Sequence, residues 1–249
     1  MAGRPSRTPR FFAHTDLHEG ERLALPEAVS HHALRVLRLA QGDAVVLFDG
    51  HGGEYPAQVA EIARSTLIVA VGAHNAVERE SLLDVTLLQG ISSGERMDLT
   101  IQKTIELGVR ALRPVHAERS VVRLDAKRVE AKHGHWRRVA ISACEQCGRN
   151  RLPELHPAST LPEACRDLDP AATRLLLAPD GTVRVRDVVA DPQRPVVLAA
   201  GPEAGFGPAE EDVLLRAGFV PVRIGSRVLR TETAAPAALA ALNALCGEF

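Results

Sequence analysis

The sequence has no apolar run that approaches the roughly 20 residues of a membrane-spanning helix. The N-terminal segment MAGRPSRTPRFF is basic, but it lacks the apolar core and the cleavage site of a secretory signal. These two absences predict a cytoplasmic protein. With 249 residues, the chain is long enough for one large domain or two modest ones.

Cysteine is scarce, with four residues in 249, and a chain of this length does not need disulfides to hold a core. Cys144 and Cys147 form the motif CEQC, which invites a zinc or redox interpretation. A second pair of ligands is missing, and the motif lies late in a helical segment, not after a strand. We therefore interpret them as two small apolar residues on neighbouring turns, and we expect no metal.

Net charge is also small, at −1, but it is unevenly distributed. The window from residue 110 to 151 contains eleven basic residues and four acidic ones. The basic residues are Arg110, Arg113, Arg119, Arg123, Lys127, Arg128, Lys132, Arg137, Arg138, Arg149 and Arg151. The acidic residues are Glu118, Asp125, Glu130 and Glu145. Such a local excess is typical of a face that binds a polyanion. It is equally typical of a solvated basic helix, so charge alone leaves both interpretations open.

A phosphate-binding glycine loop is absent. The stretch GPEAGFGP is not G-x-G-x-x-G, and the helix after it begins PAEED. Glu210, Glu211 and Asp212 complement the dipole of that helix, so a pyrophosphate there would meet three carboxylates. This argues against a dinucleotide and favours a zwitterionic or cationic ligand.

The first part of the chain predicts short strands separated by turns, in RFFA, ERLALP, AVVLFDG, EYPAQVAEIA and STLIVAVGA. One short helix, SHHALRVLRL, interrupts them, and Ser30 can cap it. Together these elements predict a small closed or nearly closed β-barrel of about 70 residues. The polar segment at residues 74–81 marks the expected boundary, which separates a domain at 1–74 from one at 80–249.

The second part alternates strands and helices. Strands are predicted in LDVTLLQGI, ALRPVHA, RLLLAP, PVVLAAG and FVPVRIG, with helices at RMDLTIQKTIELGV and from about residue 125 to 148. Strands that are apolar throughout their length indicate a parallel sheet covered on both faces. Ligands bind such sheets at the carboxyl ends of the strands, so the active site is expected at the loops 178–181, 201–212 and 225–234.

The stretch IGSRVLRTETAAP, which precedes an alanine-rich helix, carries more polar chemistry than a turn requires. Thr231 or Thr233 can cap the helix, and Pro236 is acceptable only in its first turn. Capping leaves the remaining charged residues, Arg227, Arg230 and Glu232, without an explanation.

Several motifs, in chain order, resemble the RsmE family: RFF, VLRL with AQGD, AVVLFDG and HGGEYPAQV, then KTIELGV, ACEQCGR, GPEAGF and IGSRVLRTETA. These are S-adenosylmethionine-dependent methyltransferases of 16S ribosomal RNA in the SPOUT superfamily. The resemblance implies an α/β SPOUT-type parallel sheet with a C-terminal trefoil knot at 80–249, and a PUA-like RNA-binding β-barrel at 1–74. It also implies a homodimer, with the RNA and cofactor sites near the interface.

The resemblance implies methylation of N3 of a specific uridine in 16S ribosomal RNA of the small subunit. The implied cofactor-binding residues lie on three loops: Leu177, Gly201, Pro202, Glu203, Gly205, Ile224, Gly225, Val228, Leu229, Arg230 and Thr233. The implied RNA-binding residues are Arg10, Arg35, Arg38, Gln146 and Arg149. For catalysis, Arg149 or Arg230 would stabilise the uracil anion, and Glu203 or Glu145 would accept the N3 proton. The residues do not decide within either pair.

One residue departs from the family pattern, which has a second glycine where this chain has Ala204. If that position requires a positive φ, alanine costs about 1 kcal/mol and weakens cofactor binding. Two alternatives therefore stay open. One is another SPOUT methyltransferase with a different RNA or ribose target, and the other is a ribosome assembly factor that binds RNA through a decayed site.

Overall fold

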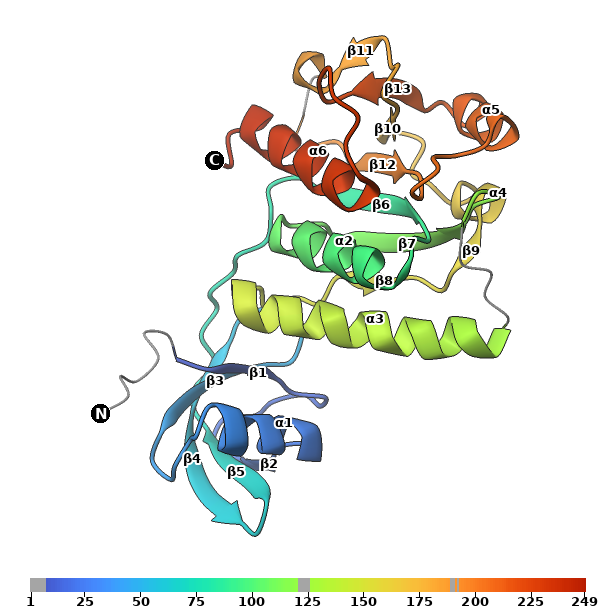
Figure 1. The fold of residues 1–249 in the computed structure, drawn as a ribbon. Helices are drawn as coiled ribbons and strands as arrows, with labels where there is room; N and C mark the ends of the chain where they lie inside the picture. The colour runs from blue at the N-terminus through green and yellow to red at the C-terminus, as the bar shows by residue number, and fades with distance from the viewer. Residues whose placement is uncertain (1–7, 121–125, 189–190, 192) are drawn as a thin grey trace. The chain divides into compact units, whose positions relative to one another are not determined.

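A computed structural model of the chain describes residues 8–120, 126–188, 191 and 193–249. Contacts between residues divide the chain into two compact units, which Figure 1 shows in ribbon form. The first unit comprises residues 1–80 together with 144–152, and the second comprises 81–143 together with 153–249. Helix α3 (Ala126–Cys147) ends inside the segment that belongs to the first unit. The boundary predicted at residues 74–80 does not account for the segment 144–152, which returns to the first unit. The predicted domains, 1–74 and 80–249, stay a prediction.

The first unit is built on a five-stranded sheet with the strand order β1-β3-β4-β5-β2. Its strands are β1 (Arg10–Phe12), β2 (Arg22–Ala24), β3 (Ala44–Phe48), β4 (Tyr55–Ala63) and β5 (Thr66–Val71). The β1–β3 pair is parallel and the other pairs are antiparallel. Within the described residues no ladder joins the outer strands β1 and β2, so the sheet does not close into a fully hydrogen-bonded barrel.

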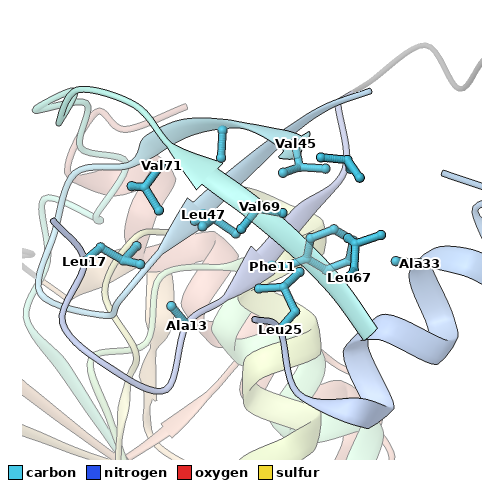
Figure 2. Packing of buried hydrophobic residues seen from close by; sticks show 12 residues of the cluster. Phe11, Ala13, Leu17, Leu25, Ala33, Val45, Leu47, Leu67, Val69 and Val71 are labelled. Atoms are coloured by element: carbon cyan, nitrogen blue, oxygen red, sulfur yellow. The ribbon is translucent and has the colours of Figure 1, made fainter. Parts of the chain in front are cut away.

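Alternating side chains of these strands form the core of the first unit (Figure 2). In β5 the buried positions are Leu67, Val69 and Val71, as the two-residue period of a strand requires. Phe11 and Leu47 join them from β1 and β3. The apolar alternation that predicts the strands therefore also selects the face on which they pack.

The helix of this unit differs from the prediction at its start. It consists of α1 (Glu27–His31) and a π-helical turn, η1 (His32–Val36), and its N-cap is Pro26. Ser30 is not the cap: it lies inside α1, where its buried hydroxyl donates to Leu25 O and accepts from Leu67 N, both at 3.0 Å. Leu67 on β5 is 37 residues away in the sequence, so the local sequence does not predict this hydrogen bond.

Buried polar contacts of Arg10 and Arg149 attach the segment 144–152 to the rest of the first unit. Arg10 pairs with Glu54 at 2.5 Å and donates to Asn150 Oδ1 at 2.5 Å. Arg149 pairs with Glu80, and only 4% of the Arg149 side chain is exposed. Burial opposes ionisation of Glu54, but hydrogen bonds from Arg79 and Arg10 outweigh it and lower the pKa of this carboxyl.

The second unit contains a parallel sheet with the order β11-β13-β10-β12-β6-β7-β8, with β9 paired to β7. Its strands are β6 (Val85–Gly90), β7 (Ala111–His116), β8 (Glu154–Leu155), β9 (Ser159–Thr160), β10 (Thr173–Leu177), β11 (Val183–Arg184), β12 (Val196–Ala200) and β13 (Val220–Arg223). Every ladder described in this sheet is parallel, as the long apolar strands predict. β12 is buried at every position, because both faces of the sheet are covered.

Helices α2 (Gly94–Glu106) and α6 (Thr231–Leu245) lie side by side against this sheet (Figure 1). Helices α4 (Leu161–Ala164) and α5 (Pro208–Arg216) pack with strand residues such as Leu88 and Val197. The short 3₁₀ helix η2 (Val185–Asp187) contacts α6. Across the described residues, no helix combines the length and apolarity needed to cross a membrane.

Candidate functional site

A cavity of about 400 Å³ opens at the carboxyl ends of β10, β12 and β13. The loops that follow these strands supply most of its wall, and α2 and α6 supply the rest. Its lining consists of Arg96, Leu177, Ala178, Pro179, Ala200, Gly201, Pro202, Glu203, Gly205, Val222, Ile224, Gly225, Arg227, Val228, Leu229, Arg230, Thr231, Glu232 and Ala234. The three loops expected at this rim thus converge on one concave site, and its size is that of a small-molecule pocket.

All the residues predicted to bind the cofactor line this cavity except Thr233. Thr233 is exposed, and its backbone N–H donates to Arg230 O in the first turn of α6. Its neighbours Thr231 and Glu232 line the cavity instead. The helical rotation of about 100° per residue separates these side chains, and the exact start of the helix could not be read from the sequence.

The start of α6 corrects the predicted cap. The N-cap residue is Arg230, and neither threonine caps the helix with its side chain. The Thr231 hydroxyl donates to Gly201 O at 2.8 Å and accepts from Gln89 Nε2 at 3.2 Å. Pro236 lies beyond the first turn, where its missing N–H leaves Glu232 O without the usual helical partner. The two hydrogen bonds of the Thr231 hydroxyl therefore connect α6 to the loop after β12 and to the end of β6.

The loop at residues 201–207 places its one positive φ at Gly205, with φ of 71°. Ala204 is not among the non-glycine residues with positive φ, which in the described chain are Arg38 and Arg64. The expectation that alanine strains this position is therefore wrong. Arg119 Nη1 reaches both Ala204 O at 3.4 Å and Phe206 O at 3.3 Å, so the loop is held through its carbonyl groups.

Glu203 is fixed in the wall of the cavity by hydrogen bonds from the start of α2. Its Oε1 accepts from Ser93 N at 2.9 Å, from Ser93 Oγ at 2.7 Å and from Arg96 Nη1 at 3.1 Å. Burial alone would raise the pKa of this carboxyl, but these donors outweigh burial and lower its pKa to about 2. Glu203 is therefore a permanent negative charge and a weak base.

This low pKa makes a testable contribution to stability. A carboxyl whose pKa is lowered by folding stabilises the folded state above its unfolded pKa, and the contribution is lost as pH falls through the folded pKa. We expect Glu203→Gln to lower the free energy of unfolding by on the order of 2 kcal/mol at neutral pH. The difference from wild type should shrink between pH 4.5 and about 2 in urea titrations. A difference that stays constant over this range would contradict the assignment.

Arg96 and Glu232 complete the polar side of the cavity. The Arg96 guanidinium lies 3.1 Å from Glu203 Oε1 and 3.9 Å from Glu232 Oε2. Arg96 is absent from the sequence prediction, and no local signal marks it, because 107 residues separate it from Glu203. The lining carries two carboxylates, Glu203 and Glu232, and three guanidinium groups, Arg96, Arg227 and Arg230, and this mixture of charges suits a zwitterionic ligand.

The remaining predicted catalytic residues lie in the first unit. Glu145 accepts a hydrogen bond from Phe12 N at 3.0 Å, and burial raises the pKa of this carboxyl. Gln146 is exposed, whereas Arg149 is buried against Glu80. The structure does not bring any of the three into the wall of the cavity.

Of the three arginines predicted to contact phosphates, one is buried and two are exposed. The Arg10 side chain is buried in the first unit, where its guanidinium also lies 5.1 Å from the centre of the Phe48 ring. Little of its surface is therefore accessible to RNA. Arg35 and Arg38 are exposed, at η1 and just after it. Within the basic window, Arg123 and Asp125 lie outside the described residues, as do the side chains of Lys127 and Arg128.

Comparisons with known proteins find similarity over most of the chain. Residues 78–243 match the RNA methyltransferase domain family, and residues 25–71 match the RNA methyltransferase PUA domain family. The ribosomal RNA small subunit methyltransferase E of Buchnera aphidicola subsp. Schizaphis graminum is 30% identical over 245 residues, which cover 98% of each chain.

Two solved structures with a bound ligand are also similar. A putative methyltransferase from Legionella pneumophila in complex with the cofactor SAM is 37% identical, with a TM-score of 0.91 over 96% of this chain and 98% of that chain. The ribosomal RNA small subunit methyltransferase E of Neisseria gonorrhoeae, bound to S-adenosyl methionine, is 36% identical, with a TM-score of 0.88 over the same shares.

Proposed function

Because the chain belongs to the RsmE family of S-adenosylmethionine-dependent ribosomal RNA methyltransferases, we propose that it methylates N3 of a specific uridine in 16S ribosomal RNA of the small subunit. The observation that carries this proposal is the cavity at the carboxyl ends of β10, β12 and β13. Its carboxylates and guanidinium groups together suit a zwitterionic ligand, and relatives of the same fold bind S-adenosylmethionine.

The residues of the cavity fit this ligand. Leu177, Ile224 and Leu229 supply an apolar wall for the adenine, and the main chain of residues 201–205 supplies polar groups beside it. Among the residues that the structure describes, the buried atom Glu203 Oε2 has no hydrogen-bond partner, so the cavity retains an acceptor for a ligand donor. S-adenosylmethionine supplies a methyl group on positively charged sulfur. The low pKa of Glu203 keeps a compensating negative charge in the wall.

Arg230 is better placed than Arg149 to act on the substrate. It is exposed, lines the cavity and precedes the first turn of α6, whereas Arg149 is buried in an ion pair with Glu80. N3 of uracil lies on the pairing edge, so the base must be unpaired to reach the methyl donor. As N3 loses its proton, the Arg230 guanidinium stabilises the negative charge on the base. The loops around the cavity hold the reacting groups in line.

The rest of the proposal concerns architecture and partners. Residues 80–249 form a SPOUT domain with a C-terminal trefoil knot, and residues 1–74 form a PUA-like RNA-binding domain. Arg35 and Arg38 contact phosphates of the 16S RNA. The protein acts in the cytoplasm as a homodimer. The likeness to relatives over nearly the whole chain and the match to a PUA domain family support the two-domain architecture, and the exposure of both arginines supports the RNA contact.

Mass spectrometry of ribosomal RNA tests the reaction. A strain that lacks this protein should lose N3-methyluridine from 16S RNA, and the purified protein should restore it. Arg230→Ala should lower turnover about 100-fold, because it removes the group that stabilises the anion, while calorimetry still detects S-adenosylmethionine binding. Arg216→Ala is the control, because Arg216 is 81% exposed on α5 and outside the cavity. Retained N3-methyluridine, or a methylated ribose as the product, would refute the proposal.

A further inference from the structure

Two carboxylates line the cavity, and their surroundings differ. Glu203 Oε1 accepts three hydrogen bonds from Ser93 and Arg96. Glu232 accepts no hydrogen bond among the residues that the structure describes, although only 12% of its side chain is exposed. A carboxylate that is largely enclosed and has no donor is expensive unless a ligand supplies one.

The two oxygens of Glu232 have distinct environments. Oε2 is buried without a hydrogen-bond partner and lies 3.9 Å from Arg96 Nε. Oε1 belongs to neither the bonded nor the buried unpartnered atoms of the described chain, so the exposed part of this side chain includes Oε1. Because Glu232 lines the cavity, a substrate donor can approach Oε1 while Arg96 orients the carboxylate from its other side.

We propose that Glu232 is the group that accepts the N3 proton of the target uridine, with Arg96 as its positioning residue. This inference rests on the proposed function. The N3–H bond breaks and the proton moves to the Glu232 carboxylate. The electron pair left on N3 forms the bond to the methyl carbon. The bond between that carbon and sulfur breaks, and its electron pair stays on sulfur, which becomes a neutral thioether.

The competing carboxylates are less suited to this step. Glu203 is held by three hydrogen-bond donors, which make it a poor base, and Glu145 already accepts a hydrogen bond from Phe12 N within the first unit. The other charged residues that line the cavity with Glu232 are Arg96 from α2, Glu203 from the loop after β12, and Arg227 and Arg230 from the segment before α6. Arg230 stabilises the negative charge on the uracil while Glu232 accepts the proton, so the two residues assist the same proton transfer.

The test compares the full-length wild type with Glu232→Gln on 16S RNA or purified small subunits. Under single turnover, N3-methylation should slow at least about 100-fold, because a general base contributes on that order or more. Calorimetry with S-adenosylmethionine alone should still detect binding, because Glu203 keeps its negative charge in the wall and the amide keeps the shape of the wall. The residual rate should rise about tenfold per pH unit as hydroxide removes the proton, whereas the wild-type rate should level off.

Two variants sharpen the result. Glu232→Asp keeps a carboxylate, so it should retain partial activity and the wild-type pH dependence. Glu211→Gln removes an exposed charge from α5, outside the cavity, and should leave rate and affinity unchanged. An unchanged rate in Glu232→Gln, a slowed rate with the wild-type pH dependence, or loss of S-adenosylmethionine binding would each overturn the role of Glu232. If the wild type itself forms no N3-methyluridine, the proposed function fails, a result that does not depend on the variants.

Discussion

Gly90→Ala should weaken S-adenosylmethionine binding by about tenfold or more, because overpacking a closely packed contact costs roughly 1–3 kcal/mol. Gly90 ends β6, and a methyl group on it would lie 2.4 Å from Pro202 Cδ and 2.6 Å from Pro202 N. The second contact is with backbone, so rotation of a side chain cannot relieve it. The loop of residues 201–205 must then move, and the wall of the cavity moves with it. Isothermal calorimetry measures the change in affinity.

Gly94→Ala is the matched control. Gly94 begins α2, and a methyl group there meets nothing within 4 Å. Alanine also has a higher helix propensity than glycine, so this variant should bind the cofactor normally and be at least as stable as wild type. Equal affinities for Gly90→Ala and Gly94→Ala would show that the approach of β6 to the loop does not shape the cofactor site.

Arg10→Met should lower the free energy of unfolding by about 3 kcal/mol, because it leaves the buried partners of a charge uncompensated. Only 5% of the Arg10 side chain is exposed, and it bridges Glu54 and Asn150 Oδ1. Methionine fills part of the volume but donates no hydrogen bond. Arg79 still contacts Glu54 at 2.9 Å, which keeps the loss near the lower end for a buried pair. Urea denaturation followed by circular dichroism measures it.

Arg22→Met provides the comparison within the same unit. Arg22 pairs with Glu61 at 2.8 Å, but the two side chains are 57% and 53% exposed. Solvent screens such a pair, so its removal should cost less than about 1 kcal/mol. If both variants lost the same stability, the ion pair of Arg10 would contribute no more than a surface contact.

Much of the second unit could be predicted from its strands. Val196–Ala200 is apolar at every position, which is typical of a central parallel strand, and the structure places it between β10 and β6. The rim of the site was predictable for a related reason: parallel strands end at the same edge of a sheet, so their loops converge. The motifs GPEAGF and IGSRVLRTETA then directed attention to two of these loops.

Particular side chains were harder to place, and each failure has a physical cause. Ser30 and Thr231 look like helix caps, but each hydroxyl bonds to a strand or loop that is distant in sequence. Arg149 looks like a cation available for RNA, but Glu80 pairs with it. In each case a tertiary partner satisfies the polar group, and residue type and spacing say nothing about that partner.

The sequence by itself determined the class of the fold, the parallel direction of its apolar strands, the family, and the loops from which the site is built, because these depend on local pattern and on motifs. Only the tertiary structure decided what each charged group contacts: within the described residues, Glu203 accepts three hydrogen bonds, Glu232 accepts none, and the Arg96 guanidinium lies near both. The reason is that the basicity of a carboxylate depends on its burial and on the donors within hydrogen-bonding distance. In this protein those donors come from residues more than a hundred positions away.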